Sequence, residues 1–242
     1  YTGRYTCDTY APNVLQIAEK LWEADMWGGF VWATSCRVDT NRNFLIHDFL
    51  NKSDARFLFI IDEDMIHPSN IATVLAGRNK PIITGLYFRR DYGGNYYPVI
   101  YKANGRDKEH RRGHGTAEND IFATMIAEVS DYFGSKGAVP KTDGPVVLQN
   151  EDGTLLDDSL IRIDGGGFGC IMLRRDALEK MDEPYLLSEP GLNGDFVFYR
   201  NAGKKGIDIW ADLSMICAHK LDSTISVASF YDFAMRTRPV HV

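Results

Sequence analysis

Residues 57–90 read FLFIIDEDMIHPSNIATVLAGRNKPIITGLYFRR, and this segment carries the clearest indication of the fold. It overlaps one apolar run, residues 55–61, and contains another, residues 81–88, both of the kind found in strands buried on two faces. Pro68 lies between the runs and can begin a helix, because the first turn of a helix does not need its missing N–H. The segment therefore predicts a strand, a helix and a second strand, as in an α/β fold.

The same alternation of helix and strand patterns continues on both sides of this segment. Apolar residues at helical spacing predict a helix over residues 12–27 and another over residues 41–50, the latter with Phe44, Leu45, Phe49 and Leu50 facing inward. Further strands are expected at residues 30–33, 161–164, 169–173, 207–211 and 214–218, and further helices at residues 117–133, 174–181, 195–203 and 225–235. The pattern predicts one α/β domain over residues 1–242, with a mostly parallel sheet flanked by helices.

Composition limits the classes of partner. The chain has 242 residues, 44% of them hydrophobic, which is typical of a globular domain, and its net charge of -6 argues against nucleic-acid binding. No apolar run reaches the ~18 residues of a transmembrane helix, and the first residues are polar, so neither a membrane span nor a signal peptide is expected. The four cysteines have no CxxC spacing and read as buried thiols of a reducing compartment, which favours the cytoplasm.

Residues 104–158 stand apart from the rest of the chain. They are rich in glycine, aspartate and lysine and show no long apolar period apart from the helix expected at residues 117–133. Long segments of this kind beside the site of an α/β protein often act as lids or bind the second substrate. We therefore expect a mobile insertion here.

Asp62, Glu63 and Asp64 directly follow the first apolar run, at the predicted carboxyl end of a buried strand. Open α/β sheets bind ligands at that edge, and alternate residues of an extended segment point to the same side. Asp62 and Asp64 can therefore converge on a divalent cation, whose remaining ligands are phosphate oxygens. The triplet also fits a solvated acidic turn, or a helix N-cap ahead of Pro68.

Three other groups of residues are candidates for the same edge. His219 follows a predicted strand and, as a neutral imidazole, can be a metal ligand. Arg89 and Arg90 follow the strand at residues 81–88, and their guanidinium groups suit phosphate. The glycine-rich residues 165–169 let the backbone approach a ligand closely. Structural readings stay open for all three: a histidine with a purely structural role, a solvated charged edge, and a bulge or tight turn.

Residues 57–90 resemble the core of GT-A glycosyltransferases, a Rossmann-like α/β fold, and in particular small bacterial or phage members near family 2 and the Anp1-like mannosyltransferases. Two later segments resemble further blocks of these enzymes. Residues 165–181, GGGFGCIMLRRDALEKM, resemble their glycine-rich strand and following helix. Residues 194–220, GDFVFYRNAGKKGIDIWADLSMICAHK, resemble the block with an acid at a helix start, a strand and a terminal histidine. The blocks occur in the same order as in the family.

The resemblance implies roles for individual residues around a Mn²⁺ or Mg²⁺ ion. Asp62 is then a contact of the ribose or the cation, Asp64 the principal ligand of the cation and His219 an additional ligand. Asp195 stands where inverting members carry the catalytic base, although Gly194 replaces the acid that commonly precedes it. The remaining residues of the implied donor site are Glu63, Arg89, Arg90, Gly166 and Gly167.

The resemblance also implies a first strand that cradles the nucleotide base. That strand should precede Tyr1, so Tyr1, Gly3 and Arg4 are expected at the base-binding loop.

The function expected from these residues is metal-dependent transfer of a sugar, with inversion, from a UDP- or GDP-sugar to a glycan or another hydroxyl acceptor. Two alternatives stay open. A nucleotidyltransferase that makes sugar nucleotides binds the same nucleotide but catalyses a different reaction, and its usual loop, rich in glycine and basic residues, follows the first strand, which is expected ahead of Tyr1. A carbohydrate-binding protein that has lost catalysis fits the same fold.

Overall fold

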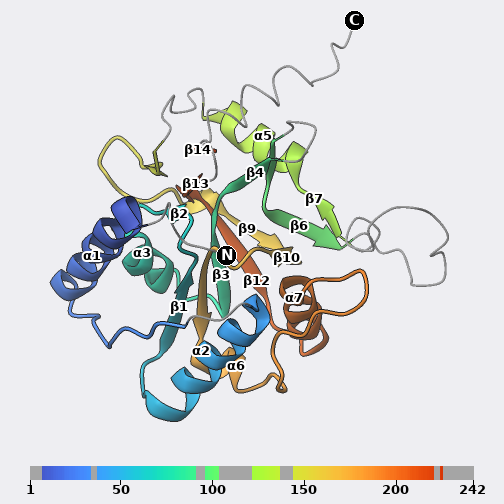
Figure 1. Ribbon diagram of the computed structural model, residues 1–242. Helices are drawn as coiled ribbons and strands as arrows, with labels where there is room; N and C mark the ends of the chain where they lie inside the picture. The colour runs from blue at the N-terminus through green and yellow to red at the C-terminus, as the bar shows by residue number, and fades with distance from the viewer. Residues whose placement is uncertain are drawn as a thin grey trace, which may run out of the picture.

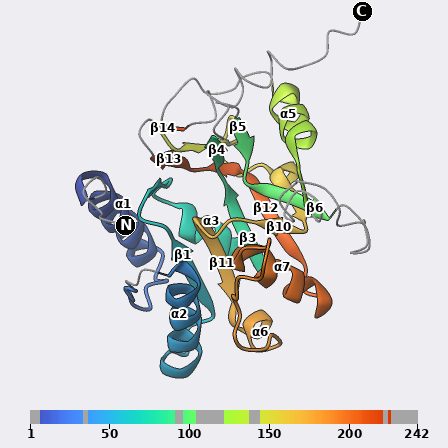
Figure 2. The same cartoon turned by 45° about the vertical axis from the view of Figure 1, so that its right-hand side comes forward.

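The computed structural model describes residues 7–33, 37–90, 96–103, 122–136, 144–220 and 224–225. These residues form a single mixed α/β domain in which six α-helices surround a central sheet (Figure 1). One hydrophobic core lies under α1 and α3, and the other lies under α2, α5 and α6 on the opposite face of the sheet (Figure 2). The single domain and the α/β class agree with the prediction.

The direction of the strands in the central sheet differs from the prediction. The sheet has the order β1-β11-β3-β12-β8, and a sixth strand, β9, also pairs with β12. Only β3 and β12 are parallel, and the other four pairings are antiparallel, so a mostly parallel sheet was wrong. The bounds are β1 Phe57–Ile61, β3 Ile82–Leu86, β8 Val146–Val147, β9 Leu160–Ile163, β11 Cys170–Arg174 and β12 Ile209–Ile216.

The reason for the difference is the position of β11. This strand comes from a later part of the chain and inserts between β1 and β3, antiparallel to both. Since β11 is antiparallel to both neighbours, β1 and β3 run in the same direction, and β12 runs parallel to β3. The carboxyl ends of these three strands therefore lie at one edge of the sheet, as the prediction of the site requires. β1 forms the opposite border of the sheet from β8, and of its residues only Ile60 is buried, so it is not a strand buried on both faces.

The described helices follow the predicted order with shifted ends. Their bounds are α1 Cys7–Glu23, α2 Val38–Lys52, α3 Ile71–Gly77, α5 Ile126–Ser135, α6 Arg175–Leu178 and α7 Gly194–Lys204. α1 begins earlier than predicted and contains Pro12. α3 begins three residues later than predicted, at Ile71, and Pro68 lies in the turn ahead of it, where its carbonyl accepts a hydrogen bond from the Ile71 N–H. Residues 30–33 form no strand, and Phe30 and Trp32 are exposed.

The inward face of α2 also differs from the prediction. Its buried residues are Arg42, Ile46 and Phe49, whereas Phe44 is 46% exposed. Arg175 anchors the far end of the helix, since its guanidinium donates to the carbonyls of Phe49 and Ser53 at 3.0 and 2.6 Å. A cation is favourable there because the last carbonyls of a helix have no partners within it.

Smaller sheets lie at the carboxyl edge and continue the central strands. Instead of two separate predicted strands, β12 is one long strand with an irregularity between Asp212 and Ile216, and β13 follows it. β13 pairs with the short strand after the acidic triplet, which brings His219 opposite Met65. The bounds are β2 Met65–Ile66, β4 Phe88–Arg90, β5 Tyr96–Pro98, β6 Ile100–Ala103, β7 Phe122–Thr124, β10 Gly165–Gly166, β13 Ala218–Lys220 and β14 Thr224–Ile225.

The expected insertion at residues 104–158 lies partly outside the described residues. Its described part contains β7, α5, β8 and the start of a short 3-10 helix, Asp157–Ser159, so the helix expected at residues 117–133 begins later, at Ile126. The mobility of the insertion stays a prediction. The helix expected at residues 225–235 also falls outside the described residues, except for Ile225, which lies in β14. Among the described helices, none combines the length and apolar character needed to cross a bilayer.

Candidate functional site

The acidic triplet forms the turn between β1 and β2, at the carboxyl edge of the sheet. Glu63 is exposed, while Asp62 and Asp64 are partly buried and point to different partners. Backbone hydrogen bonds fix the turn, since the Asp62 N–H donates to the Gly169 carbonyl at 3.3 Å and the Lys220 N–H donates to the Asp64 carbonyl at 2.7 Å. The helix N-cap reading of the triplet is not found, because the residue that precedes α3 is Asn70.

Asp64 and His219 face each other, as the sequence predicted. His219 Nε2 lies 3.2 Å from Asp64 Oδ2, and Nδ1 of the same ring lies 3.3 Å from the Phe88 carbonyl oxygen. Burial lowers the pKa of His219, but the hydrogen bond and charge of Asp64 outweigh it and raise the pKa above the usual value. Both ring nitrogens thus face acceptor oxygens, whereas a neutral imidazole has only one N–H. A second ring proton, or a metal cation between Nε2 and Asp64, would satisfy both contacts.

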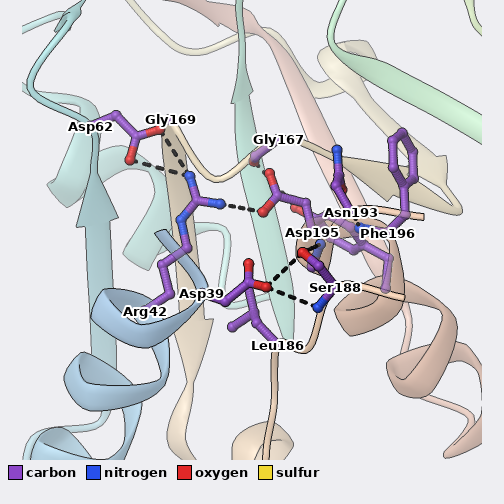
Figure 3. A network of polar contacts seen from close by, with 12 residues as sticks. Asp39, Arg42, Asp62, Gly167, Gly169, Leu186, Ser188, Asn193, Asp195 and Phe196 are labelled. Carbon is purple, nitrogen blue, oxygen red and sulfur yellow. Dashed lines mark hydrogen bonds and ion pairs between the residues drawn. The ribbon is translucent and has the colours of Figure 1, made fainter. Parts of the chain in front are cut away.

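Arg42 joins Asp62 to Asp195, and sequence reasoning missed it. This side chain is buried, and its Nη2 donates to both oxygens of Asp62, at 3.0 Å to Oδ2 and 3.3 Å to Oδ1. Its Nη1 forms an ion pair with Asp195 Oδ1 (Figure 3). The guanidinium also lies 4.8 Å from the centre of the Phe168 ring, which adds a cation–π contact. One signal was present, because Arg42 has helical spacing with the buried Ile46 and Phe49.

Asp195 lies in the first turn of α7, but it is not the cap of that helix. The cap is Asn193, whose side-chain oxygen accepts a hydrogen bond from the Phe196 N–H at 3.2 Å. Burial raises the pKa of Asp195 to about 6, since desolvation outweighs the opposing effect of Arg42, and the charge of Asp62 acts in the same direction as burial. Asp195 is therefore not needed to cap α7.

A pocket of about 380 Å³ opens beside this network. Its lining comes from the amino-terminal half of α2 with the residue before it, and from the start of α7 with the loop ahead of it: Arg37, Val38, Asp39, Arg42, Ser188, Asn193, Gly194 and Asp195. Asp39 accepts hydrogen bonds from the Ser188 N–H and hydroxyl, at 2.8 and 2.6 Å, and so ties the two walls together (Figure 3). The pocket combines two carboxylates with two arginines.

The glycine-rich residues 165–169 are buried, and tyrosines approach them closely. A Cβ at Gly167 would lie 2.8 Å from Tyr87 Cζ and 2.9 Å from Val99 Cγ1, which is closer than packed atoms allow. The Tyr199 hydroxyl donates to the Gly167 carbonyl at 3.3 Å, and the Tyr87 hydroxyl accepts from the Gly169 N–H at the same distance. Packing alone thus explains a glycine at position 167, and the contact of Gly166 and Gly167 with a donor stays a prediction.

The other predicted donor-site residues are only partly placed. Arg89 and Arg90 are exposed on β4, directly after Phe88, whose carbonyl contacts His219. Arg89 and Arg90 therefore directly follow a residue that contacts His219. Tyr1, Gly3 and Arg4 lie outside the described residues.

Replacing Arg42 by methionine should lower the free energy of unfolding by about 3–5 kcal/mol, because it leaves the largely buried Asp195 carboxylate without its cation. Urea denaturation at pH 7 measures this. Arg162→Met is the matched control, since Arg162 and Asp208 form an exposed pair whose loss should cost less than about 1 kcal/mol. The double variant Arg42→Met/Asp195→Asn should recover part of the loss. Equal losses in the single and double variants would contradict the argument.

Comparison with known proteins gives little further information. No family model matches the chain, and no curated protein matches it. Among solved structures, it is similar to A197 from STIV, with 16% sequence identity, 88% of this chain and 86% of that chain covered, and a TM-score of 0.48. A likeness of this degree carries no conclusion about function, which has to come from the site.

Proposed function

We propose that the chain is a metal-dependent glycosyltransferase of the GT-A type, which moves a sugar from a nucleoside diphosphate sugar to a hydroxyl acceptor. The observation that carries the proposal is the Asp64–His219 pair, in which a carboxylate oxygen and a ring nitrogen lie 3.2 Å apart at the carboxyl edge of the sheet. Three sequence blocks of the resembled enzymes contain the residues of this edge, including Asp62, Asp64, Asp195 and His219.

The pair suits a divalent cation in distance and in chemistry. Neighbouring ligands of an octahedral cation with bonds of about 2.1 Å lie about 3 Å apart, close to the separation of Asp64 Oδ2 and His219 Nε2. With its Nδ1 proton donated to the Phe88 carbonyl, His219 presents the lone pair of Nε2, as a metal-binding histidine does. Carboxylate and imidazole together suit Mn²⁺ better than Mg²⁺. Bound there, the cation would neutralise the charge of the leaving diphosphate.

Asp195 is the proposed general base. Its pKa of about 6 leaves it mostly ionised at pH 7 and makes it a stronger base than an ordinary aspartate. It borders the pocket, so an acceptor hydroxyl that enters there can reach its carboxylate. Removal of the hydroxyl proton prepares the oxygen to attack the anomeric carbon of the donor.

Asp39 supplies the second acid that the sequence appeared to lack. Gly194 stands where the resembled enzymes commonly have an acid before the base. A Cβ at that position would lie 2.7 Å from Asp39 Cγ, so the carboxyl group of Asp39, on α2, occupies the space next to Asp195. The charge of Asp39 also contributes to the raised pKa of Asp195. An acid is therefore present beside the proposed base, although it comes from another helix.

Arg42 is a positioning residue in this proposal. It holds the carboxylates of Asp62 and Asp195 on one guanidinium, which links the turn that carries the proposed cation ligands to the helix that carries the base. The same ion pairs also fit a second candidate, a carbohydrate-binding protein without catalysis. In such a protein, Asp62 and Asp195 would serve only to neutralise the buried charge of Arg42.

The proposal is tested with a panel of UDP- and GDP-sugars in Mn²⁺ or Mg²⁺. A cognate donor at 100 times its dissociation constant should stabilise the fold by about 2.7 kcal/mol, read as a thermal shift, and only with metal present. Release of the nucleoside diphosphate, as the sugar is transferred to water or to added glycans, then measures the reaction. A thermal shift without turnover would favour the binding protein. Release of pyrophosphate from a nucleoside triphosphate and a sugar phosphate would favour the nucleotidyltransferase, and the absence of any metal-dependent shift would contradict the proposal.

A further inference from the structure

A second group of side chains that can bind a metal lies on chain segments next to those of the Asp64–His219 pair. His67, Cys170 and Cys217 are all buried, and their ligand atoms lie within 4.8 Å of one another. Two of these residues belong to the segments of the first site, since His67 comes three residues after Asp64 and Cys217 two residues before His219. No residue of this cluster has a role in the proposed sugar transfer.

The sheet brings the two cysteines together from opposite sides of β3. In the β11–β3 pairing, Ile171 is the partner of Thr84, which places Cys170 beside Gly85. On the other side of β3, the Cys217 N–H donates to the Leu86 carbonyl at 2.8 Å. Gly85 leaves room between them, since a Cβ at this position would lie only 3.0 Å from Cys170 Sγ.

This arrangement does not suit a disulfide. Neighbouring strands are about 4.8 Å apart, so residues on the two strands that flank β3 have backbones separated by roughly twice that distance. A disulfide needs Cα atoms no more than about 6.8 Å apart. The two thiols therefore converge without being able to join, unless the strands move.

His67 completes the cluster from the turn after β2. Asn13 on α1 fixes its backbone, because the Asn13 side chain accepts from the His67 N–H and donates to the His67 carbonyl, both at 2.8 Å. Nδ1 of His67 lies 3.3 Å from Cys217 Sγ. The other ring nitrogen, Nε2, is buried and has no hydrogen-bond partner among the described residues. A buried polar atom of this kind is rare and calls for an explanation.

We infer that Cys170, Cys217 and His67 form a site for a soft divalent cation of the Zn²⁺ class, separate from the oxygen-rich site at Asp64. Thiolate and imidazole ligands are those that Zn²⁺ prefers. Bonds of about 2.3 Å to sulfur and 2.0 Å to nitrogen place tetrahedral ligands about 3.5–3.8 Å apart, a range that the cluster reaches with small shifts. Two thiolates also cancel the charge of the cation, and a neutral centre suits a site buried among apolar side chains.

The thiols are suited to this role. Burial raises the pKa of Cys170, but hydrogen bonds with Cys217 and His67 lower it more, to about 6. A bound cation would favour the thiolate form of both cysteines. The cation would join the turn after β2 to β11 and to the end of β12, and so would support the two segments that carry Asp64 and His219.

The test uses the full chain with Cys7 and Cys36 replaced by serine, so that Cys170 and Cys217 are the only thiols. The reduced protein is refolded with Co²⁺, a spectroscopic substitute for Zn²⁺. We expect one equivalent of Co²⁺ to produce thiolate-to-cobalt charge-transfer absorption and the visible bands of a tetrahedral ion, and Zn²⁺ to abolish both. Cys170→Ser and Cys217→Ser should each reduce the charge-transfer absorption by about half or more, and His67→Gln should shift the visible bands.

The matched control is Asp64→Ala, which changes the proposed oxygen-rich site and should leave the cobalt spectrum unaltered. This separates the inference from the proposed sugar transfer, on which it does not depend. Absence of charge-transfer absorption in the protein that keeps both thiols overturns the inference, whether or not the serine variants fold. A cobalt spectrum that survives the loss of both Cys170 and Cys217 also overturns it.

Discussion

Asp195→Asn should lower the rate of sugar transfer by about 10²–10⁴-fold while donor binding stays near its normal value, the effect expected when a general base is lost. The substitution keeps the size of the side chain, and Asn193 still caps α7. The neutral amide, however, cannot take the proton of the acceptor hydroxyl. Steady-state kinetics with the cognate donor, together with the donor's dissociation constant, measure the two quantities separately.

The pH dependence provides an independent readout of the same residue. Asp195 is active as a base only when it is ionised, and its pKa is about 6. The rate in the normal protein should therefore rise about tenfold per pH unit below pH 6 and level off above it, whereas the residual rate of Asp195→Asn should lack this rise. The exposed Asp208→Asn is the control for a lost carboxylate, and it should leave the rate unchanged. Near-native turnover in Asp195→Asn would remove the base from the mechanism. Retention of configuration in the product, measured by NMR, would do so as well.

Asp64→Ala should remove metal-dependent donor binding while the fold survives. The Asp64 side chain is 39% exposed, so its truncation leaves no large cavity. Residues that only support metal ligands change affinity by about 10–100-fold, so loss of a direct ligand should weaken Mn²⁺ binding by at least about 100-fold. Isothermal titration with Mn²⁺ and a nucleoside diphosphate measures the loss.

The structure provides a matched control and a second test for Asp64. Asp54 is an exposed acid just ahead of β1, at the opposite end of the strand from the triplet, and Asp54→Ala should bind metal normally. His219→Ala should resemble Asp64→Ala, and the double variant should lose little more than either single variant, because the two residues act on one ion. Unchanged metal affinity in Asp64→Ala, or independent and additive losses, would contradict a shared cation.

The parts of the fold that depend on local pattern were predictable from sequence. The strand, helix and strand predicted within residues 57–90 occur as β1, α3 and β3, since apolar runs and helical spacing are properties of neighbouring residues. The position of β11 in the sheet was not predictable, because its pairing with β1 joins segments more than one hundred residues apart. The sequence of an apolar strand also does not indicate whether the strand runs parallel or antiparallel to its neighbours. The prediction of a mostly parallel sheet failed for this reason.

The candidate site was predictable only where a functional residue follows a strand. Asp64 and His219 meet because their strands end at the same edge, and both were singled out from that position. Arg42 was missed because an arginine on a helix is usually exposed, and only the burial of Ile46 and Phe49 shows that this face turns inward. The position of the Asp39 carboxyl group beside Gly194 depends on how α2 packs against α7, and the spacing of residues along the chain does not predict that packing.

The cysteine cluster illustrates the same limit in a different way. Cys170 and Cys217 were expected to be buried thiols, and they are. Their approach across Gly85, with His67 beside them, involves separations in sequence far larger than those of known metal-binding motifs. The same expectation for Cys7 and Cys36 stays a prediction, because their side chains are not among those that the structure describes.

The way in which α2 is attached has a mechanical consequence. Arg175 holds the carboxyl end of this helix to the body of the protein, whereas Arg42 and Asp39, nearer its other end, contact the acidic turn, the first turn of α7 and the loop ahead of α7. The helix is thus attached to the body of the protein at one end and to the residues of the candidate site near the other. Because Asp39 and Arg42 both line the pocket, a tilt of α2 about the Arg175 anchor would change the contacts of Arg42 with Asp62 and Asp195 and the width of the pocket in the same movement.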